Sequence, residues 1–339
     1  KDAEPYPVAM AAADGGVPGT KYAGFHDAQI HVRGRYDRLG ETVPRHFPRI
    51  LAGDNQPPIT QGSGRLELAR WITRPDNPLI ARVMVNRIWM HHFGQGLVRT
   101  PGNFGTMGQA PTHPELLDFL AGRFIESGWS IKAMHRLLTQ SAVYLQSSRV
   151  PVEVATADPE NRLWGRMNRR RLEAEAIRDT LLSASGQLDR TVGGPVVRKL
   201  DDYAVSRRRA LYLMTNRSDK TNFRFLFDGA DPEGVVDQRS ISTVAPQALY
   251  ILNNPLVMAQ TTALVERLLR ESPAGDSERI ERAYELLFGR RPAAEERELG
   301  LVFLTRVAER KPAGEDGARF AWEAYCQSLL CANELIYVD

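Results

Sequence analysis

The sequence predicts a mainly α-helical protein, a multi-helix orthogonal bundle with a small β-sheet. From Gly64 onward, helix start signals precede periodic apolar runs, and glycines follow those runs. Only three short segments have the composition of strands: Tyr6–Met10, Ala28–Arg33 and Ala210–Thr215. We expect these segments, from the N-terminal arm and the centre of the chain, to pair into one sheet.

The composition is typical of a globular protein and excludes several classes. Of 339 residues, 42% are hydrophobic and 25% are charged, which is enough for a packed core. The net charge of +3 gives no general attraction to nucleic acid or anionic membranes. No apolar run approaches the roughly 20 residues of a membrane span. Two arginine triplets, 169–171 and 207–209, precede apolar residues and lie in no recognised nucleic-acid-binding module.

The chain divides into an N-terminal arm (1–60) and a helical domain (61–339). The arm is rich in proline and glycine. In the helical domain we expect a first helical half (61–190), a strand with irregular loops (191–242) and a set of C-terminal helices (243–339).

Capping residues predict the first helices in order. Asn77-Pro78 begins a helix that Gly94 ends. Thr112-His113-Pro114-Glu115 has the pattern of a capping box, and Gly128 closes the helix that follows. Ser130 caps the next helix, which we expect to run to about Gln146.

Further helices follow to the end of the chain. We expect one to open at Asp158-Pro159 and another to cover 172–188. The remaining predicted helices are 245–252, 255–271, 277–288, 293–310 and 317–335. The last contains Cys326 and Cys331, which are too far apart along a helix to form a disulfide and are expected to be small buried hydrophobes.

The densest polar and aromatic segment is the helix that ends at Gly94. Its adjacent His91 and His92 point about 100° apart, so one could bind a metal while the other packs. The zinc spacing H-E-x-x-H is absent, which favours a hydrogen-bonded, half-buried pair near a helix C-terminus. The candidate binding residues are Asn86, Arg87, Trp89, His91, His92, His113 and Glu115.

A glycine-rich segment at 94–108 connects this helix to the next. Such a loop before a helix can bind an anion, but this one follows a helix and breaks the G-x-G-x-x-G pattern. A tight connection between packed helices is the favoured interpretation. His113 at its end could meet His91 or His92, and Glu115 or Asp118 would then complete a metal or acid–base cluster.

The remaining chemical signals are weak. Asp228, Asp231 and Glu233 are spaced as calcium ligands can be, but the EF-hand pattern is not met, so a solvated loop is favoured. Motifs of serine and cysteine nucleophiles are missing. The haem-attachment motif C-x-x-C-H is also missing, so we expect no cofactor in this chain.

A series of motifs runs in order through most of the chain. They include Gly64-Arg65, Asn77-Pro78, Asn86-Arg87, His91-His92-Phe93-Gly94, Pro111-Thr112-His113-Pro114-Glu115, Gly128-Trp129-Ser130, Arg169-Arg170-Arg171, Pro246-Gln247 and Asn333-Glu334. This order resembles the first planctomycete-specific domain family, whose function is unknown. Two positions depart from the family pattern: Met90 replaces a commonly polar residue, and Ala230 replaces a frequent proline.

The resemblance implies a context more than an activity. Members of the family are usually the C-terminal part of exported planctomycete proteins. Upstream they carry a cytochrome-c-like domain and a second helical domain, sometimes with a carbohydrate-binding sandwich between them. The resemblance therefore implies an extracytoplasmic location, periplasmic or at the cell surface, and a chain that is a fragment or a processed product.

Two functions are compatible with these signals. The first is a non-catalytic helical module that interacts with the upstream cytochrome-type and helical domains, with glycans or with envelope components. The alternative is a hydrolase acting on polysaccharide, with a His/Glu or metal site between the helices at 79–93 and 113–127.

Overall fold

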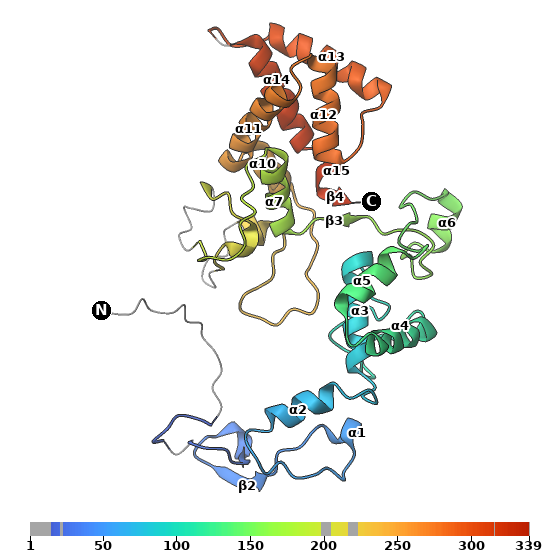
Figure 1. Cartoon of the computed structure of the whole chain (residues 1–339), viewed down its shortest axis with the longest axis vertical. Coiled ribbons are helices and arrows are strands. Elements are labelled where there is room, and N and C mark those ends of the chain that lie inside the picture. Colours follow the sequence, from blue (N-terminus) through green and yellow to red (C-terminus); the bar gives the residue numbers. More distant parts are fainter. Residues whose placement is uncertain (1–14, 21–22, 198–204, 216–222, 315, 339) are drawn as a thin grey trace. The chain divides into compact units, whose positions relative to one another are not determined.

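The computed structural model describes residues 15–20, 23–197, 205–215, 223–314 and 316–338, and it is mainly α-helical (Figure 1). The predicted fold class is confirmed. Contacts within the chain define two compact units, 1–141 and 142–339. The expected division at residue 60 lies inside the first of these units.

The N-terminal unit begins with a β-hairpin. Strand β1 (Ala28–His31) pairs antiparallel with β2 (Leu39–Val43), and the register shifts between Gln29 and His31. The expected pairing of the arm with a central strand is wrong, because Ala210–Tyr212 forms the 3₁₀ helix η2. A partner close in sequence closes a short loop at little entropic cost. The predicted strand at 6–10 lies outside the described residues.

Short elements connect the hairpin to the first helices. The 3₁₀ helix η1 (Val32–Gly34) follows β1, and α1 (Arg49–Ala52) and α2 (Arg65–Ile72) follow β2. Phe47, just before α1, stacks on Trp71 of α2 with ring centroids 4.9 Å apart.

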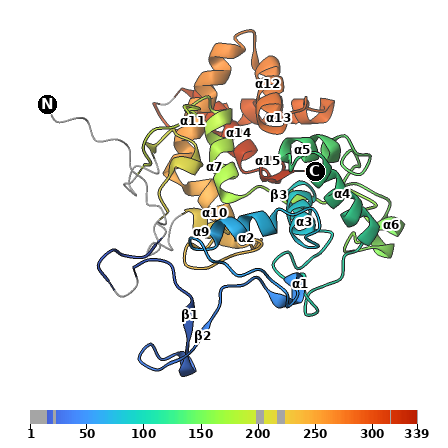
Figure 2. The same cartoon turned by 60° about the horizontal axis from the view of Figure 1, so that its bottom comes forward.

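Three helices form the core of the N-terminal unit. Helix α3 (Ile80–Phe93) packs on α4 (Pro114–Glu126) and α5 (Ile131–Thr139), and the three lie together in both views (Figures 1 and 2). The buried apolar side chains include Val85, Trp89, Phe93, Leu97, Leu117, Leu120, Phe124, Met134 and Leu138. Burial of these side chains from water is the main force that holds α3, α4 and α5 together.

Capping residues begin and end these helices much as the sequence predicts. The Asn77 side-chain oxygen accepts hydrogen bonds from the backbone N–H groups of Leu79 and Ile80. Gly94 ends α3 with φ at 82°, a left-handed conformation that suits glycine. Ser130 caps α5 by accepting from the Ala133 N–H. However, α5 ends at Thr139, earlier than expected.

The second unit contains the remaining elements. They are α6 (Val152–Ala157), β3 (Arg170–Arg171), α7 (Ala174–Ala184), η2, α9 (Phe223–Leu226), α10 (Ala245–Asn253), α11 (Pro255–Glu271), α12 (Asp276–Phe288), α13 (Ala294–Glu309), α14 (Gly317–Leu330), α15 (Asn333–Ile336) and β4 (Tyr337–Val338). Strands β3 and β4 pair antiparallel, which ties the last described residues to the segment before α7.

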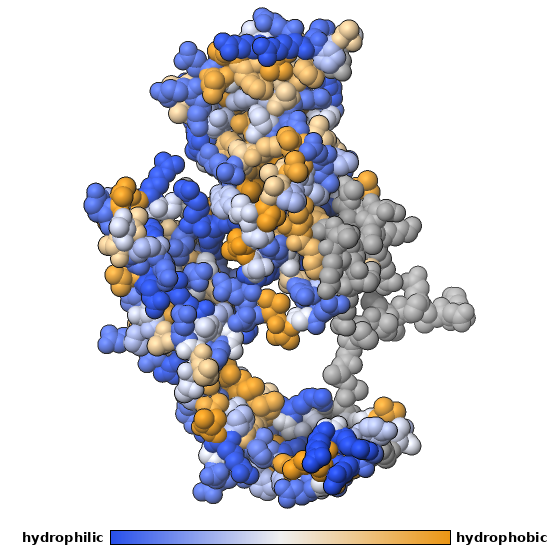
Figure 3. All heavy atoms as spheres, turned by 180° about the vertical axis from the view of Figure 1, so that it is seen from behind, coloured by the Kyte–Doolittle hydropathy of each residue, from blue (hydrophilic) through white to orange (hydrophobic). Residues whose placement is uncertain are grey.

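Helices α11 to α14 and α7 enclose the core of this unit. Its fully buried side chains include Ile177, Leu181, Val257, Leu264, Leu268, Ile280, Cys326 and Leu330. Hydrophilic side chains cover the top edge of these C-terminal helices, with more apolar side chains below them on the same face (Figure 3).

Three details of the second unit differ from the sequence prediction. Helix α6 ends before Asp158, whose carboxylate instead accepts from the N–H groups of Arg162 and Leu163 in a turn. The predicted last helix is broken at Cys331 into α14 and α15. Cys326 is buried as expected but Cys331 is exposed, and both are free thiols.

Candidate functional site

Asn86 is part of the fold and not of an open site. Its side chain is fully buried, donates to the Val98 carbonyl at 3.0 Å and accepts from the Val98 N–H at 2.8 Å. A Cβ on Gly96 would lie 2.4 Å from that carbonyl and 2.7 Å from the Asn86 amide nitrogen, so only glycine fits there. This geometry favours the tight connection over an anion-binding loop.

The other α3 candidates point in different directions. Trp89 is buried and stacks on Phe93 with ring centroids 4.1 Å apart, as a core residue does. Arg87 and His91 are exposed, whereas His92 is half-buried. Because successive side chains point in different directions around a helix, some candidate side chains of this segment lie in the core and others lie on the surface.

His92 meets a histidine that the sequence analysis did not single out. Its Nε2 lies 2.7 Å from Nδ1 of His135 on α5, and the rings meet edge to face with centroids 4.9 Å apart. In sequence, His135 is one polar residue on the amphipathic helix α5, with no spacing that links it to His92. Only the packing of α3 on α5 brings the two imidazoles together.

The predicted capping box at the start of α4 is wrong. His113 occupies the N-cap position without a side-chain cap, and its Nδ1 lies 3.1 Å from the hydroxyl oxygen of Thr112. Pro114 fills the first helical turn, where no backbone N–H is needed. Glu115 is exposed in the same turn, where its charge suits the positive end of the helix.

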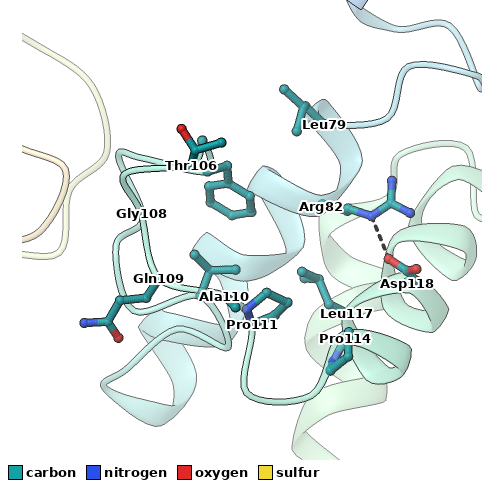
Figure 4. A pocket seen from close by; sticks show the side chains of 13 residues that line it. Leu79, Arg82, Thr106, Gly108, Gln109, Ala110, Pro111, Pro114, Leu117 and Asp118 are labelled. Atoms are coloured by element: carbon teal, nitrogen blue, oxygen red, sulfur yellow. Dashed lines mark hydrogen bonds and ion pairs between the residues drawn. The ribbon is translucent and has the colours of Figure 1, made fainter.

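A pocket of about 380 Å³ opens beside these residues (Figure 4). The start of α3, the loop at 104–111 and the first turns of α4 form its walls. Its lining residues are Leu79, Arg82, Val98, Phe104, Gly105, Thr106, Gly108, Gln109, Ala110, Pro111, Pro114, Leu117 and Asp118. Most of these side chains are apolar. A volume of this size is within the lower range of ligand-binding pockets.

An ion pair marks the polar side of the pocket. The Arg82 Nε donates to Asp118 Oδ1 at 2.6 Å (Figure 4). A hydrogen bond from Arg82 Nη1 to the Pro78 carbonyl fixes the guanidinium. The hydrogen bond from Arg82 holds the pKa of Asp118 below its ordinary value. Asp118 therefore stays a carboxylate at neutral pH and is a poor proton donor.

The lining of the pocket separates the sequence candidates. Of the acid–base cluster considered from the sequence, only Asp118 lines the pocket, whereas His91, His92, His113 and Glu115 do not. The loop at 104–111 was not predicted as a binding wall. The glycines and prolines of this loop are its signal in the sequence, and they favour a tight connection between packed helices over a binding site.

In the acidic loop of the second unit, Asp228 bonds to residues outside the loop, whereas Asp231 bonds within it. Arg171 donates to Asp228 at 2.6 Å, and Ser242 donates to it through both its N–H and its hydroxyl. Burial acts to raise the pKa of Asp228, but the bonds from Ser242 and Arg171 hold it below its ordinary value. Asp231 accepts from the Glu233 N–H in a local turn. The weak calcium candidates therefore do not converge.

Helix α7 carries a second charged cluster that the sequence candidates omit. Glu175 accepts from Arg224 at 2.9 Å and from Arg239 at 2.6 Å. Burial acts to raise the pKa of Glu175, but these two arginines hold it below its ordinary value. The buried Arg178 donates to two backbone carbonyls, those of Ser206 and Arg208. This cluster ties distant loops to α7, which is a structural use of charge.

Two kinds of feature are absent from the described parts of the chain. Within them, no three or more His, Cys, Asp or Glu side chains gather as a metal site would require. Among the same residues, no helix combines the length and apolar character needed to cross a lipid bilayer.

The fold and the pocket define a helical protein with a mainly apolar surface pocket next to an Arg–Asp pair. The family model of PSD1, described as a protein of unknown function (DUF1553), matches residues 64–304. The chain belongs to this family. No curated protein and no solved structure matches the chain.

Proposed function

We propose that this chain is a non-catalytic helical module of an exported planctomycete multidomain protein and that it docks on a partner domain of that protein. Support for the wider context comes from the resemblance, which implies an extracytoplasmic location and neighbouring cytochrome-c-like and helical domains. The candidate interaction site is the pocket between the start of α3, the 104–111 loop and α4.

The main support for docking is that the pocket combines an apolar interior with an ion pair at its edge. Leu79, Val98, Phe104 and Leu117 give it an apolar interior, and the exposed Arg82–Asp118 pair stands beside them. Binding energy at protein interfaces is concentrated where an apolar or aromatic anchor enters such a pocket within a polar rim. We therefore expect the occupant to be a large apolar side chain of the partner domain.

The candidate acid–base residues support binding over catalysis. Hydrolysis in this pocket would use a proton donor beside the bound substrate. Of the acid–base residues that the sequence suggests, Asp118 alone lines the pocket, and Arg82 favours its ionised form. A glycan remains an alternative occupant, and the experiment below separates the two.

Photo-crosslinking in the full-length natural protein tests this proposal. A benzoylphenylalanine at Thr106, which lines the pocket, should crosslink to the upstream cytochrome-type or helical region. The matched control is the same residue at Phe119, which is exposed on α4 outside the lining. Mass spectrometry locates the crosslinks. Crosslinks to glycan alone, equal yields from both positions, or no crosslink from position 106 would each contradict the proposal.

A pocket-filling variant adds a second test. Ala110→Phe should lower the crosslinking yield from position 106 at least several-fold, because the new ring occupies the pocket. Met107→Phe places the same ring on the same loop at an exposed position outside the lining and should leave the yield unchanged.

A further inference from the structure

The His92–His135 pair has a geometry that neither the family nor the proposed docking function explains. Two imidazole nitrogens from different helices, Nε2 of His92 and Nδ1 of His135, lie 2.7 Å apart. His135 is exposed and His92 is half-buried, so solvent reaches the pair. The pair joins the last turn of α3 to the middle of α5.

A contact this short allows one proton between the two nitrogens. One ring must donate its N–H while the other accepts through a lone pair, so at most one ring of the pair is charged in this arrangement. Removing the shared proton leaves two nitrogen lone pairs that face each other across 2.7 Å, and a turn of the two rings directs both lone pairs at one metal ion. That is the electronic arrangement in which neutral imidazoles bind transition metals.

We propose that His92 and His135 bind a divalent transition-metal ion of the zinc and copper class. Zinc–imidazole bonds are about 2.0–2.1 Å long, so bond angles between 90° and tetrahedral place the nitrogens about 2.9–3.4 Å apart. The observed pair would open by only a few tenths of an ångström, which side-chain rotation at an accessible surface supplies. Water completes the coordination, which gives an open site with two protein ligands.

The proton balance of this binding is simple. In the free pair, one facing nitrogen carries a proton, and metal binding requires both facing nitrogens to be unprotonated. Through solvent, the donating ring moves its proton to its other nitrogen, and both rings remain neutral. The metal thus replaces a hydrogen bond with two coordinate bonds, and no residue changes oxidation state.

Neighbouring histidines provide matched controls. His91 precedes His92 directly, is exposed, and points about 100° away on the helix. His113 lies at the start of α4, where its Nδ1 contacts Thr112. A metal that bound any surface histidine would use these residues as readily as the pair.

Titration calorimetry of the tag-free chain with Zn²⁺ and Cu²⁺ at pH 7.5 tests the site. We expect one equivalent of either ion to bind, more tightly for Cu²⁺ in accord with the general order of divalent affinities, and Mg²⁺ not to bind. His135→Ala should weaken Zn²⁺ binding at least ten-fold, because one of the two protein ligands is lost. His91→Ala and His113→Ala should bind as the natural chain does.

Because His135 is exposed, its substitution should leave the fold intact, which circular dichroism checks. His135→Asn gives a second variant that keeps a polar side chain at the same position. Unchanged Zn²⁺ affinity in either His135 variant would overturn the proposal, as would equal losses in His91→Ala, or no binding by the natural chain at millimolar Zn²⁺. Ala110→Phe should leave metal binding intact, because Arg82 beside the pocket and His92 are about 15 Å apart along α3. A negative result for the metal site would therefore not count against the docking proposal, and the reverse also holds.

Discussion

Replacing Asn86 with alanine should strongly destabilise the N-terminal unit. The Asn86 side chain is fully buried and makes two hydrogen bonds with the backbone of Val98. Alanine removes both bonds, because its methyl side chain has neither a donor nor an acceptor. The Val98 N–H and carbonyl then lose the partners that the folded chain provides for them.

The size of the effect follows from these two groups. A buried polar group without a partner costs about 1–3 kcal/mol. Two such groups, partly relieved by relaxation of the loop, give an expected loss of about 2–4 kcal/mol in the free energy of unfolding. For a unit of this size, each kcal/mol lowers the melting temperature by roughly 3 °C, so we expect a decrease of about 6–12 °C.

Urea unfolding followed by circular dichroism measures the loss, and hydrogen exchange of the Val98 amide locates it. The matched control is Gln109→Ala, an exposed side chain on the same connection. The Val98 amide should exchange much faster in Asn86→Ala and at the natural rate in Gln109→Ala. A stability loss below about 0.5 kcal/mol, or unchanged Val98 protection, would refute the reasoning.

Two further predictions concern the second unit. Asp228→Asn should cost about 3 kcal/mol at pH 7, because it leaves the buried Arg171 guanidinium without its charged partner. Bonds from Ser242 and Arg171 hold the folded pKa of Asp228 below its unfolded value of about 3.9. The stabilisation that the Asp228 carboxylate provides is therefore complete above a pH of about 3.9 and is lost as the pH falls below that value. In urea unfolding, the difference in the free energy of unfolding between Asp228→Asn and the natural chain should therefore be smaller at pH 3 than at pH 7. An equal difference at both pH values would contradict the stabilising role assigned to the Asp228 carboxylate. Gly300→Ala should cost about 1–3 kcal/mol, because its Cβ would lie 2.7 Å from the Tyr325 hydroxyl between α13 and α14. Gly122→Ala on α4, where nothing lies within 4 Å, should be neutral or stabilising by up to about 1 kcal/mol in the same assay, and equal effects at the two glycines would contradict the packing argument.

The sequence could identify the candidate segment but not the site within it. The concentration of polar and aromatic residues points to the end of α3. In the structure, these residues have separate roles: Asn86 is a buried amide, Trp89 is a buried ring, and His92 is part of a pair at the surface. His135 could not be found from sequence, because 43 positions separate it from its partner and nothing in its local pattern marks it. The pocket was missed for a similar reason, since its walls come from three separate segments.

By itself, the sequence determined the helical class and most helix ends. Pro255–Glu271 is a helix at the predicted positions because Asn254 accepts from the Leu256 N–H and proline suits the first turn, and both effects act within a few residues. Tertiary structure alone decided the partner of His92 and the ion pair between Asp228 and Arg171. These contacts join positions that are distant in sequence, and their free energy depends on how helices and loops pack. A local pattern of residues cannot predict that packing.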